Sequence, residues 1–150
     1  MKRIVVGIDG SDGARTALKW ALTEARLHGA DLEVVVAYEI PLTNSIPGAM
    51  TPMIPSDVYV KYANGMLDMA VATVVDPNDK TVKVSKSAHH GHPGHVLRES
   101  AKDADLLVVG SRGMGGFLGL HVGSVSRYCV HHAPCPVAVI PPSTAVADSV

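Results

Sequence analysis

The sequence predicts an α/β fold, namely a single-domain, doubly wound sandwich built on a five-stranded parallel sheet. Segments of strand length occur at five places, four of them apolar runs and one alternating, and segments with helical spacing of apolar residues lie between them. The runs at residues 4–8 and 106–110 contain no polar side chain, which is typical of strands buried on both faces of a parallel sheet. The length of 150 residues and the 47% hydrophobic content fit one globular domain. We expect this domain to cover residues 1–142 and residues 143–150 to form a flexible tail.

The first part of the chain predicts a strand, a helix and a second strand. The strand at residues 4–8 ends where turn-forming residues cluster, and Ser11 or Asp12 can cap the helix that follows. Alanine and leucine repeat every three or four positions in this helix, which ends at Gly29. Residues 32–38 are mostly apolar and predict the second strand.

The middle of the chain is less regular. Residues 39–55 contain repeated prolines, and a connection this long in a compact domain is either functional or mobile. Helical spacing then predicts a helix over residues 56–75. The residues that carry this spacing are Val58, Tyr62, Met66, Met69 and Thr73. Residues 81–87 alternate between apolar and polar, which predicts a third strand with one wetter face at an edge of the sheet.

The last part of the chain predicts two more helices and two more strands. Residues 89–94 form a loop, and Pro93 suits the first turn of a helix. The fourth strand covers residues 106–110. A final helix runs over residues 124–132, and residues 135–140 form the fifth strand.

A glycine-rich loop connects the fourth predicted strand to the final helix. Its glycines are Gly110, Gly113, Gly115, Gly116 and Gly119, and Gly123-Ser124 begins the helix. A strand, a glycine-rich turn and a helix N-terminus form an anion cradle, because backbone N–H groups and the helix dipole point at the ligand. Glycine also permits a positive φ and a close approach of the backbone to phosphate oxygens. We therefore predict that this loop holds the phosphates of a nucleotide; the alternative is a glycine-rich surface loop without a ligand.

The sequence also limits the kind of phosphate site. It contains no Gly-x4-Gly-Lys-[Ser/Thr] motif, so a phosphate loop of the Walker type is excluded. The cations near the loop are Arg112 and Arg127. We expect the cradle to act mainly through main-chain amides, with modest affinity and without strong hydrolytic machinery.

Asp9 follows the first predicted strand and is the candidate carboxylate of the site. The carboxyl ends of parallel strands meet at one rim, so residues 7–9, 37–38 and those from 110 onward should come together. A carboxylate that faces phosphates binds Mg²⁺ or hydrogen-bonds a sugar hydroxyl. The alternative is a turn-forming aspartate that hydrogen-bonds its own backbone.

The spacing of the loop resembles that of nucleotide-binding universal stress proteins. Gly110, Gly113 and Gly123-Ser124 form the pattern Gly-x2-Gly-x9-Gly-Ser, with no departure from it. The resemblance extends over nearly the whole chain and is also carried by residues 5–11 and 132–137. It is a resemblance to the UspA-like, ATP-binding branch of the family, and it implies a fold similar to that of the adenine nucleotide alpha hydrolases.

The resemblance implies a set of nucleotide-binding residues. Asp9 would face the ribose or a phosphate-bound Mg²⁺, and the backbone of Ala37 would hydrogen-bond an adenine edge. The full implied set is Gly7, Asp9, Ala37, Gly110, Ser111, Arg112, Gly113, Met114, Gly115, Gly116, Gly123, Ser124 and Val125.

The predicted function is ATP binding that biases a conformation or a partner in a stress response. One alternative is a slow ATPase or adenylyl-transfer enzyme that uses Asp9 and Mg²⁺. Another is a module that binds a different nucleotide such as cyclic AMP, or a scaffold that binds protein alone. We also expect a homodimer, because the apolar strand at residues 137–140 can pair across a two-fold axis, as in the family.

Composition and cysteine content exclude several other classes of function. A net charge of -1 gives no case for a nucleic-acid partner, and no apolar run is long enough to cross a bilayer. The spacing of Cys129 and Cys135 is neither a redox motif nor a zinc motif, so we expect a cytoplasmic protein with reduced thiols. The eight histidines are expected to be solvated or to cap helices rather than to bind metal.

Overall fold

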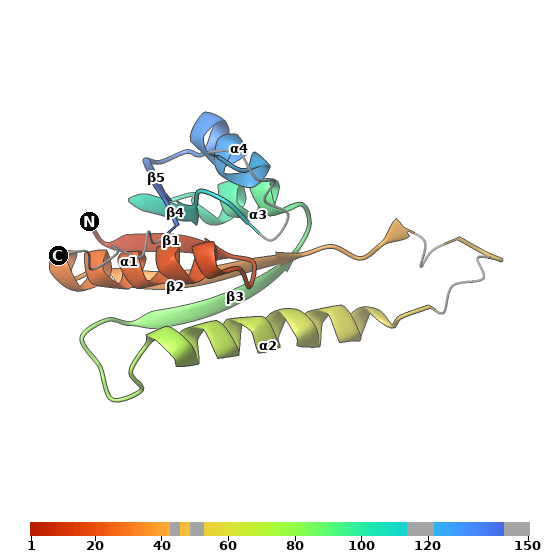
Figure 1. The fold of residues 1–150 in the computed structure, drawn as a ribbon, viewed down its shortest axis with the longest axis horizontal. Helices are drawn as coiled ribbons and strands as arrows, with labels where there is room; N and C mark the ends of the chain where they lie inside the picture. Colours follow the sequence, from red (N-terminus) through yellow and green to blue (C-terminus); the bar gives the residue numbers. More distant parts are fainter. Residues whose placement is uncertain (43–45, 49–52, 114–121, 143–150) are drawn as a thin grey trace, which may run out of the picture.

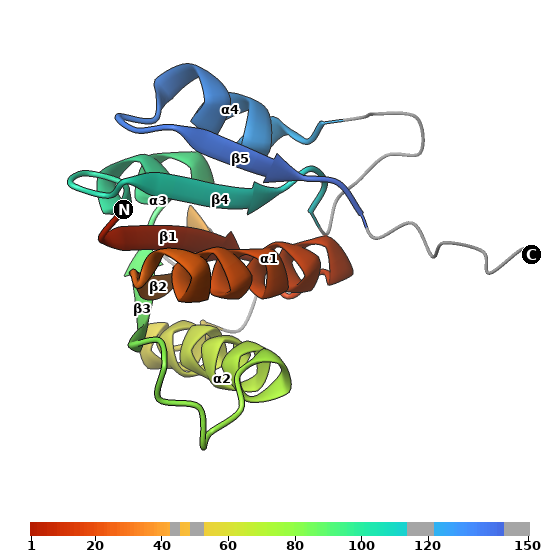
Figure 2. The same cartoon turned by 90° about the vertical axis from the view of Figure 1, so that its left-hand side faces the viewer.

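The computed structural model describes residues 1–42, 46–48, 53–113 and 122–142. The elements in chain order are β1 (Arg3–Ile8), α1 (Asp12–His28), β2 (Asp31–Tyr38), α2 (Ser56–Val74), β3 (Val84–His90), α3 (Pro93–Ser100), β4 (Leu106–Gly110), α4 (Ser124–His132) and β5 (Val137–Ile140). The five strands pair in parallel in the order β3-β2-β1-β4-β5. Helices α1 and α2 cover one face of the sheet, and α3 and α4 cover the other (Figures 1 and 2). The predicted doubly wound α/β fold is confirmed.

The core consists of two apolar layers, one on each face of the sheet. Alternating residues of a strand point to opposite faces, so Val6 packs under α1 while Val5 packs under α3 and α4. Leu18 of α1 is fully buried in the first layer, and Cys129 of α4 is fully buried in the second. Burial raises the pKa of the Cys129 thiol to about 11, so the thiol stays protonated at neutral pH.

Helix α1 begins and ends where the sequence predicts. The side-chain oxygen of Ser11 accepts a hydrogen bond from the Ala14 N–H at 3.1 Å, which makes Ser11 the N-cap. Gly29 has a φ of 61°, a left-handed conformation that glycine adopts without strain, and its N–H reaches back to the last turn.

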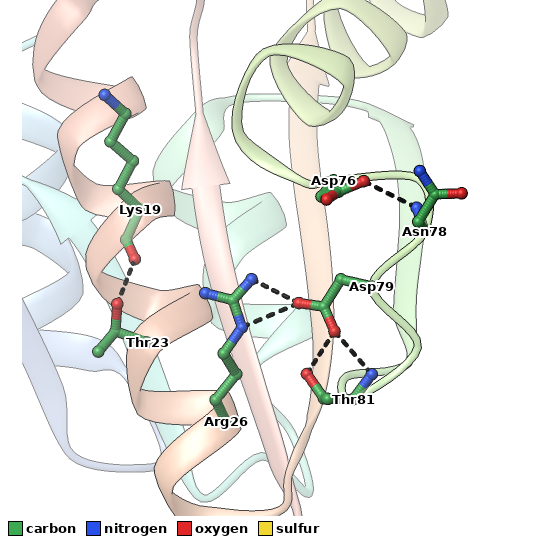
Figure 3. A network of polar contacts seen from close by, with 7 residues as sticks. All are labelled: Lys19, Thr23, Arg26, Asp76, Asn78, Asp79 and Thr81. Carbon is green, nitrogen blue, oxygen red and sulfur yellow. Dashed lines mark hydrogen bonds and ion pairs between the residues drawn. The ribbon is translucent and has the colours of Figure 1, made fainter.

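An ion pair ties α1 to the turn between α2 and β3 (Figure 3). Two guanidinium nitrogens of Arg26 donate to one carboxylate oxygen of Asp79, at 3.0 and 2.5 Å. The other oxygen accepts from the hydroxyl and the N–H of Thr81, at 2.6 and 2.9 Å. The hydrogen bonds from Thr81, together with Arg26, lower the pKa of Asp79 to about 2.

Strands β3 and β5 differ from the predicted ranges. Strand β3 pairs with β2 from Val84 to His90, so His89 and His90 lie in a strand and not in the predicted loop. Its predicted place at an edge of the sheet is confirmed. Strand β5 begins at Val137 and not at residue 135, because Pro136 has no N–H to donate to a ladder.

Helix α2 has the predicted range, but the residues that predicted it are not its buried face. Ala63 and Leu67 are buried, whereas Tyr62 is 72% and Met69 is 73% exposed. Both sides of the helix are apolar, so spacing alone does not identify the side that packs on the sheet.

Parts of the proline-rich connection, residues 43–45 and 49–52, and the predicted tail at 143–150 lie outside the described residues. Within the described ranges, every helix is too short or too polar to cross a membrane.

Candidate functional site

A cavity of about 400 Å³ lies at the carboxyl ends of β1, β2 and β4, on the face covered by α3 and α4. Strand β1 is followed by a crossover to β2 on one side and has β4 on its other side, so the cavity lies where the strand order reverses. The described residues that line it are Gly7, Ile8, Asp9, Ala14, Val35, Ala37, Pro93, Leu97, Val109, Gly110, Arg112, Gly113, Gly123, Ser124, Val125 and Ser126. The structure thus confirms that the carboxyl ends of these strands come together at one rim.

Nine of the residues implied by the family resemblance line this cavity. They are Gly7, Asp9, Ala37, Gly110, Arg112, Gly113, Gly123, Ser124 and Val125. Ser111 is instead buried beside the cavity at 6% exposure. Its N–H donates to the Ile140 carbonyl at 2.8 Å and its carbonyl accepts from the Gly123 N–H at 2.6 Å, so it joins β4 to β5 and to the start of α4. Met114, Gly115 and Gly116 lie outside the described residues.

The N-terminus of α4 opens into the cavity, and no side chain of the described residues caps it. Its N-cap residue, Gly123, has an extended backbone and offers no side chain to the first-turn amides. The first N–H groups of a helix have no partner within the helix, and the helix dipole places partial positive charge there. Ser124, Val125 and Ser126 of this first turn line the cavity. This end of the cavity therefore suits a negatively charged group.

The two neighbouring helices that begin at this rim have their first turns capped by side chains. Ser11 caps α1, and Nδ1 of His92 accepts from the Gly94 N–H at 3.2 Å to cap α3. The predicted capping role is thus confirmed for His92. Within the described part of the chain, no three histidine, cysteine or acidic side chains come together to hold a metal ion.

Asp9 combines a structural contact with a place in the cavity wall. One carboxylate oxygen accepts from the Ser11 N–H at 2.9 Å, which is the turn-forming role considered from the sequence. The other oxygen faces Gly113 so closely that a Cβ at that position would collide with it. Asp9 also lines the cavity, and it is the one acidic side chain among the described lining residues. Glycine at 113 thus lets the loop pass directly over the carboxylate.

Two of the predicted site glycines lie in tight packing. A Cβ at Gly110 would lie 3.0 Å from the backbone of Gly13, because β4 ends against the first turn of α1. A Cβ at Gly7 would lie 2.6 Å from a methyl group of Leu97 in α3. The expected positive φ is also wrong for Gly110, Gly113 and Gly123, which all have negative φ. Close approach, and not left-handed backbone, explains Gly110 and Gly113, whereas a Cβ at Gly123 would have its nearest neighbour at 3.4 Å.

Apolar side chains line the other end of the cavity, and polar backbone groups of β2 lie at its edge. The Tyr38 carbonyl accepts from the Gly91 N–H on the β3 side, so strand alternation turns the polar groups of Ala37 toward β1. The pairing of β1 with β2 ends at Ile8 and Val36, which leaves the Ala37 carbonyl just beyond the ladder. The side chains of Val35, Leu97 and Val109 line this end. A flat heteroaromatic ring with a polar edge fits such a surface.

Helices α3 and α4 are fixed to one another beside the cavity. The ring of Tyr128 lies on Gly94, where a Cβ would come within 2.6 Å of it. The ring of His95 lies 5.2 Å from that of Tyr128, and the ring of His132 lies 4.4 Å away. The hydroxyl of Ser126 donates to the Gly110 carbonyl at 2.5 Å and ties α4 to the end of β4. These contacts hold the first turn of α4 in place.

Seven lining residues are absent from the implied set of nucleotide-binding residues, although Ile8 and Ser126 lie in the ranges predicted for the rim. The seven are Ile8, Ala14, Val35, Pro93, Leu97, Val109 and Ser126. Strand alternation could have found Val35, because it shares a face with Ala37. Pro93 and Leu97 come from α3, whose position over the cavity depends on the crossover from β3 and has no local signal.

The chain is similar to known proteins over nearly its whole length. Residues 1–141 match the sequence profile of the universal stress protein family. A universal stress protein of Mycobacterium tuberculosis is 33% identical over 141 residues, which cover 93% of this chain and 48% of that protein. A universal stress protein of Thermus aquaticus is 32% identical over 144 residues, which cover 93% of this chain and 98% of that protein. The chain thus spans about half the length of the mycobacterial relative and nearly all of the Thermus one.

Solved structures of universal stress proteins share the fold. The protein UspA from Lactobacillus plantarum has a TM-score of 0.73 and 25% identity, covering 93% of this chain and 97% of that one. A protein from Archaeoglobus fulgidus solved in complex with dAMP has a TM-score of 0.66 and 26% identity, with 93% and 98% coverage. A universal stress protein solved in complex with cAMP has a TM-score of 0.61 and 26% identity, with 93% and 95% coverage. Sequence profile, relatives and fold agree, and the chain belongs to the universal stress protein family.

Proposed function

We propose that this chain binds an adenine nucleotide, with ATP as the first candidate. Binding would bias its conformation or its choice of partner in a stress response. The observation that carries the proposal is the uncapped first turn of α4, which opens into a cavity with an apolar far end. The phosphates would lie at the amides of Ser124–Ser126 and the base at Ala37. Arg112 lines the same cavity and would add a positive charge for the outer phosphates.

Two related structures support this choice of ligand class. The relatives named above were solved with dAMP and with cAMP. Both ligands join an adenine base to a phosphate, which matches the two ends of the cavity. Cyclic AMP is the second candidate, because one phosphate suffices to occupy the first turn of α4.

A magnesium ion fits the proposed site. Mg²⁺ is commonly held by one or two carboxylates together with substrate phosphates and water. Asp9 supplies one such carboxylate at the cavity wall. When bound, the ion would neutralise phosphate charge, and Asp9 would hold it while its other oxygen stays on the Ser11 N–H.

The first experiment identifies the ligand. Mass spectrometry of small molecules released from freshly purified protein is expected to detect an adenine nucleotide. Calorimetric titration with ATP, AMP and cyclic AMP then ranks them, with ATP expected to bind most tightly in the presence of Mg²⁺. Phosphate release measured on the same samples tests the alternative of a slow ATPase. A protein that releases no nucleotide and binds none of the three does not have the proposed function.

The second experiment tests the cavity. Gly113→Ala brings a methyl group onto the Asp9 carboxylate and is expected to abolish binding while leaving the fold intact. Gly65→Ala is the matched control, because that position in α2 has open space around it. The control is expected to bind normally and to gain up to about 1 kcal/mol of stability from helix propensity.

The homodimer through β5 and the cytoplasmic location stay predictions. Strand β5 lies at the edge of the sheet opposite to β3, and its residues Val137–Ile140 are half-buried. Such a strand offers unpaired backbone groups to a second copy.

A further inference from the structure

Helix α2 has two apolar faces on opposite sides, and the sheet uses one of them. The inner face packs through Ala63 and Leu67, which are buried. The outer face is exposed and consists of Val58, Tyr62, Gly65, Met69 and Ala72, which we name the α2 seam. The helix lies along the flank of the molecule, with β3 on its inner side (Figure 1). The apolar residues of this outer face are exposed although the helix already packs on the sheet through its inner face, so the seam is an unpartnered surface.

The spacing of the seam is that of a helix–helix interface. Its residues are separated by four, three, four and three positions, which is the repeat of the core positions in a coiled coil. The side chains of Tyr62 and Met69 are more than 70% exposed, and Val58 is 47% exposed. The repeat continues over two full heptads from Val58 to Ala72 without a charged residue in it.

We propose that the α2 seam binds the α2 seam of a second copy of this chain, with the two helices antiparallel across a two-fold axis. Such an interface is self-complementary, since each residue meets its counterpart on the other side of the axis. In the antiparallel arrangement Tyr62 lies opposite the partner's Gly65, and Val58 lies opposite the partner's Met69. No atom lies within 4 Å of a Cβ built on Gly65, so the tyrosine ring has room there.

The small residue in the seam supports this pairing. Glycine inside a helix costs about 1 kcal/mol relative to alanine, so its place in the middle of α2 needs a reason. A large side chain opposite a small one brings the two helices close together without a void, which is how knobs fill holes. The seam offers this match twice, once on each side of the axis.

Charges beside the seam favour the antiparallel direction. Lys61 and Asp68 flank the same side of it, seven positions apart, and have opposite charge. An antiparallel copy places Lys61 opposite the partner's Asp68, whereas a parallel copy does not bring these two charges together. Their present ion pairs, with Asp57 at 3.6 Å and with Lys86 at 2.5 Å, are exposed and leave both groups free to contact a partner as well.

This interface is separate from the proposed β5 contact. Helix α2 covers the β2–β3 side of the sheet, and β5 forms the opposite edge. The two contacts therefore do not compete, and variants can distinguish them. The inference also does not depend on nucleotide binding, because no seam residue lines the described cavity between the strand ends and α4.

Sedimentation velocity over a series of protein concentrations tests the seam. The intact protein is expected to associate beyond a single chain, and Tyr62→Glu is expected to weaken association about tenfold or more, because a buried charge would replace an aromatic anchor. Leu27→Glu is the matched control: this α1 residue is 73% exposed but lies outside the seam, and the variant should associate like the wild type. Circular dichroism checks that both variants remain folded. A protein that stays monomeric, or that associates equally with and without Tyr62, overturns the proposal.

A charge exchange tests the direction of the helices. Lys61→Glu and Asp68→Lys are each expected to weaken association several-fold, and the double variant is expected to restore it. Residues seven positions apart on one helix are about 10 Å from each other along its axis, so a pair within one chain does not explain the rescue. Losses that simply add in the double variant overturn the antiparallel arrangement.

Discussion

At the scale of single residues, Asp9 connects the fold to the proposed chemistry. One of its oxygens holds the turn after β1, so the orientation of the carboxylate is fixed before any ligand arrives. The other oxygen lies under Gly113, at the wall of the cavity. A fixed negative charge repels phosphates, and a cation between them reverses the sign of that interaction. We therefore expect Asp9 to make nucleotide affinity depend on Mg²⁺.

Asp9→Asn is expected to remove this dependence. The amide oxygen can still accept from the Ser11 N–H, but the charge is gone. We expect weaker ATP binding than wild type in Mg²⁺ and stronger binding than wild type in a chelator, measured by calorimetry. Asp12→Asn, in the exposed first turn of α1, is the control. A variant with the same Mg²⁺ dependence as the wild type would show that Asp9 does not hold the ion.

Asp79 gives a prediction for acid stability. Its pKa is lowered from 3.8 to about 2 by the hydrogen bonds from Thr81 and by Arg26. A carboxyl group whose pKa is lower in the folded state stabilises the fold at pH values above its unfolded pKa, and this stabilisation is lost as pH falls toward the folded pKa. Asp79→Asn is thus expected to lower the melting temperature at neutral pH. The difference from wild type should shrink below about pH 4, and a difference that stays constant down to about pH 2 would contradict the assigned contacts.

At the scale of elements, three helices begin around the cavity, and α4 differs from the other two in the capping of its first turn. Helices α1 and α3 have side-chain caps from Ser11 and His92, whereas α4 begins at Gly123. A cap residue with an acceptor would occupy the same amides that we assign to phosphate. Because Gly123 offers no such acceptor, and no other described side chain caps α4, we expect its first turn to be available to a ligand.

Gly123→Asp is expected to raise the stability of the fold and to weaken ATP binding. Position 123 has an extended backbone that an aspartate can adopt, and the nearest atom to a Cβ there is 3.4 Å away. The new cap should raise stability by a few tenths of a kcal/mol, measured by urea unfolding. Its charge and its hydrogen bond should weaken ATP binding more than tenfold, and Gly123→Asn, which caps without charge, should have a smaller effect. Normal ATP affinity in the aspartate variant would place the phosphates elsewhere.

Element types were predictable from the sequence where a pattern had one explanation. Buried runs such as residues 106–110 identified strands, and the capping candidates Ser11 and Asp12 limited the start of α1 to two positions. Strand β3 was placed three residues early, because residues 81–90 remain compatible with a strand throughout and the partner strand decides the register. The buried side of α2 was not predictable, because both of its sides are apolar.

The sequence predicted which strand ends surround the candidate site, but it did not predict all the contacts that form the surface of the site. Strand ends and the glycine loop indicated Asp9, Ala37 and Gly123, which do line the cavity. Gly110 was assigned to the ligand from its place in a motif, yet its close neighbour is the backbone of Gly13. Such a contact joins residues nearly one hundred positions apart, and no local pattern encodes it.

At the scale of the whole molecule, the sheet keeps the three proposed binding sites apart in space. The cavity lies at the carboxyl ends of its central strands. Helix α2, which carries the seam, lies on one flank, and β5 forms the opposite edge of the sheet (Figures 1 and 2). Ser111 joins the ends of β4 and β5 to the start of α4, so the proposed phosphate site contacts the β5 edge directly. A ligand that orders this junction is expected to influence a partner bound at β5 more than one bound at the seam.

The central claim is that the first-turn amides of α4 bind the phosphates of an adenine nucleotide. The most direct measurement is a titration of ¹⁵N-labelled protein with ATP and, separately, with adenosine, followed by amide chemical shifts. We predict large shifts at Ser124, Val125 and Ser126 with ATP and small shifts there with adenosine, while Ala37 responds to both. Saturating ATP that leaves the α4 amides unchanged, or moves them no more than adenosine does, would contradict the account.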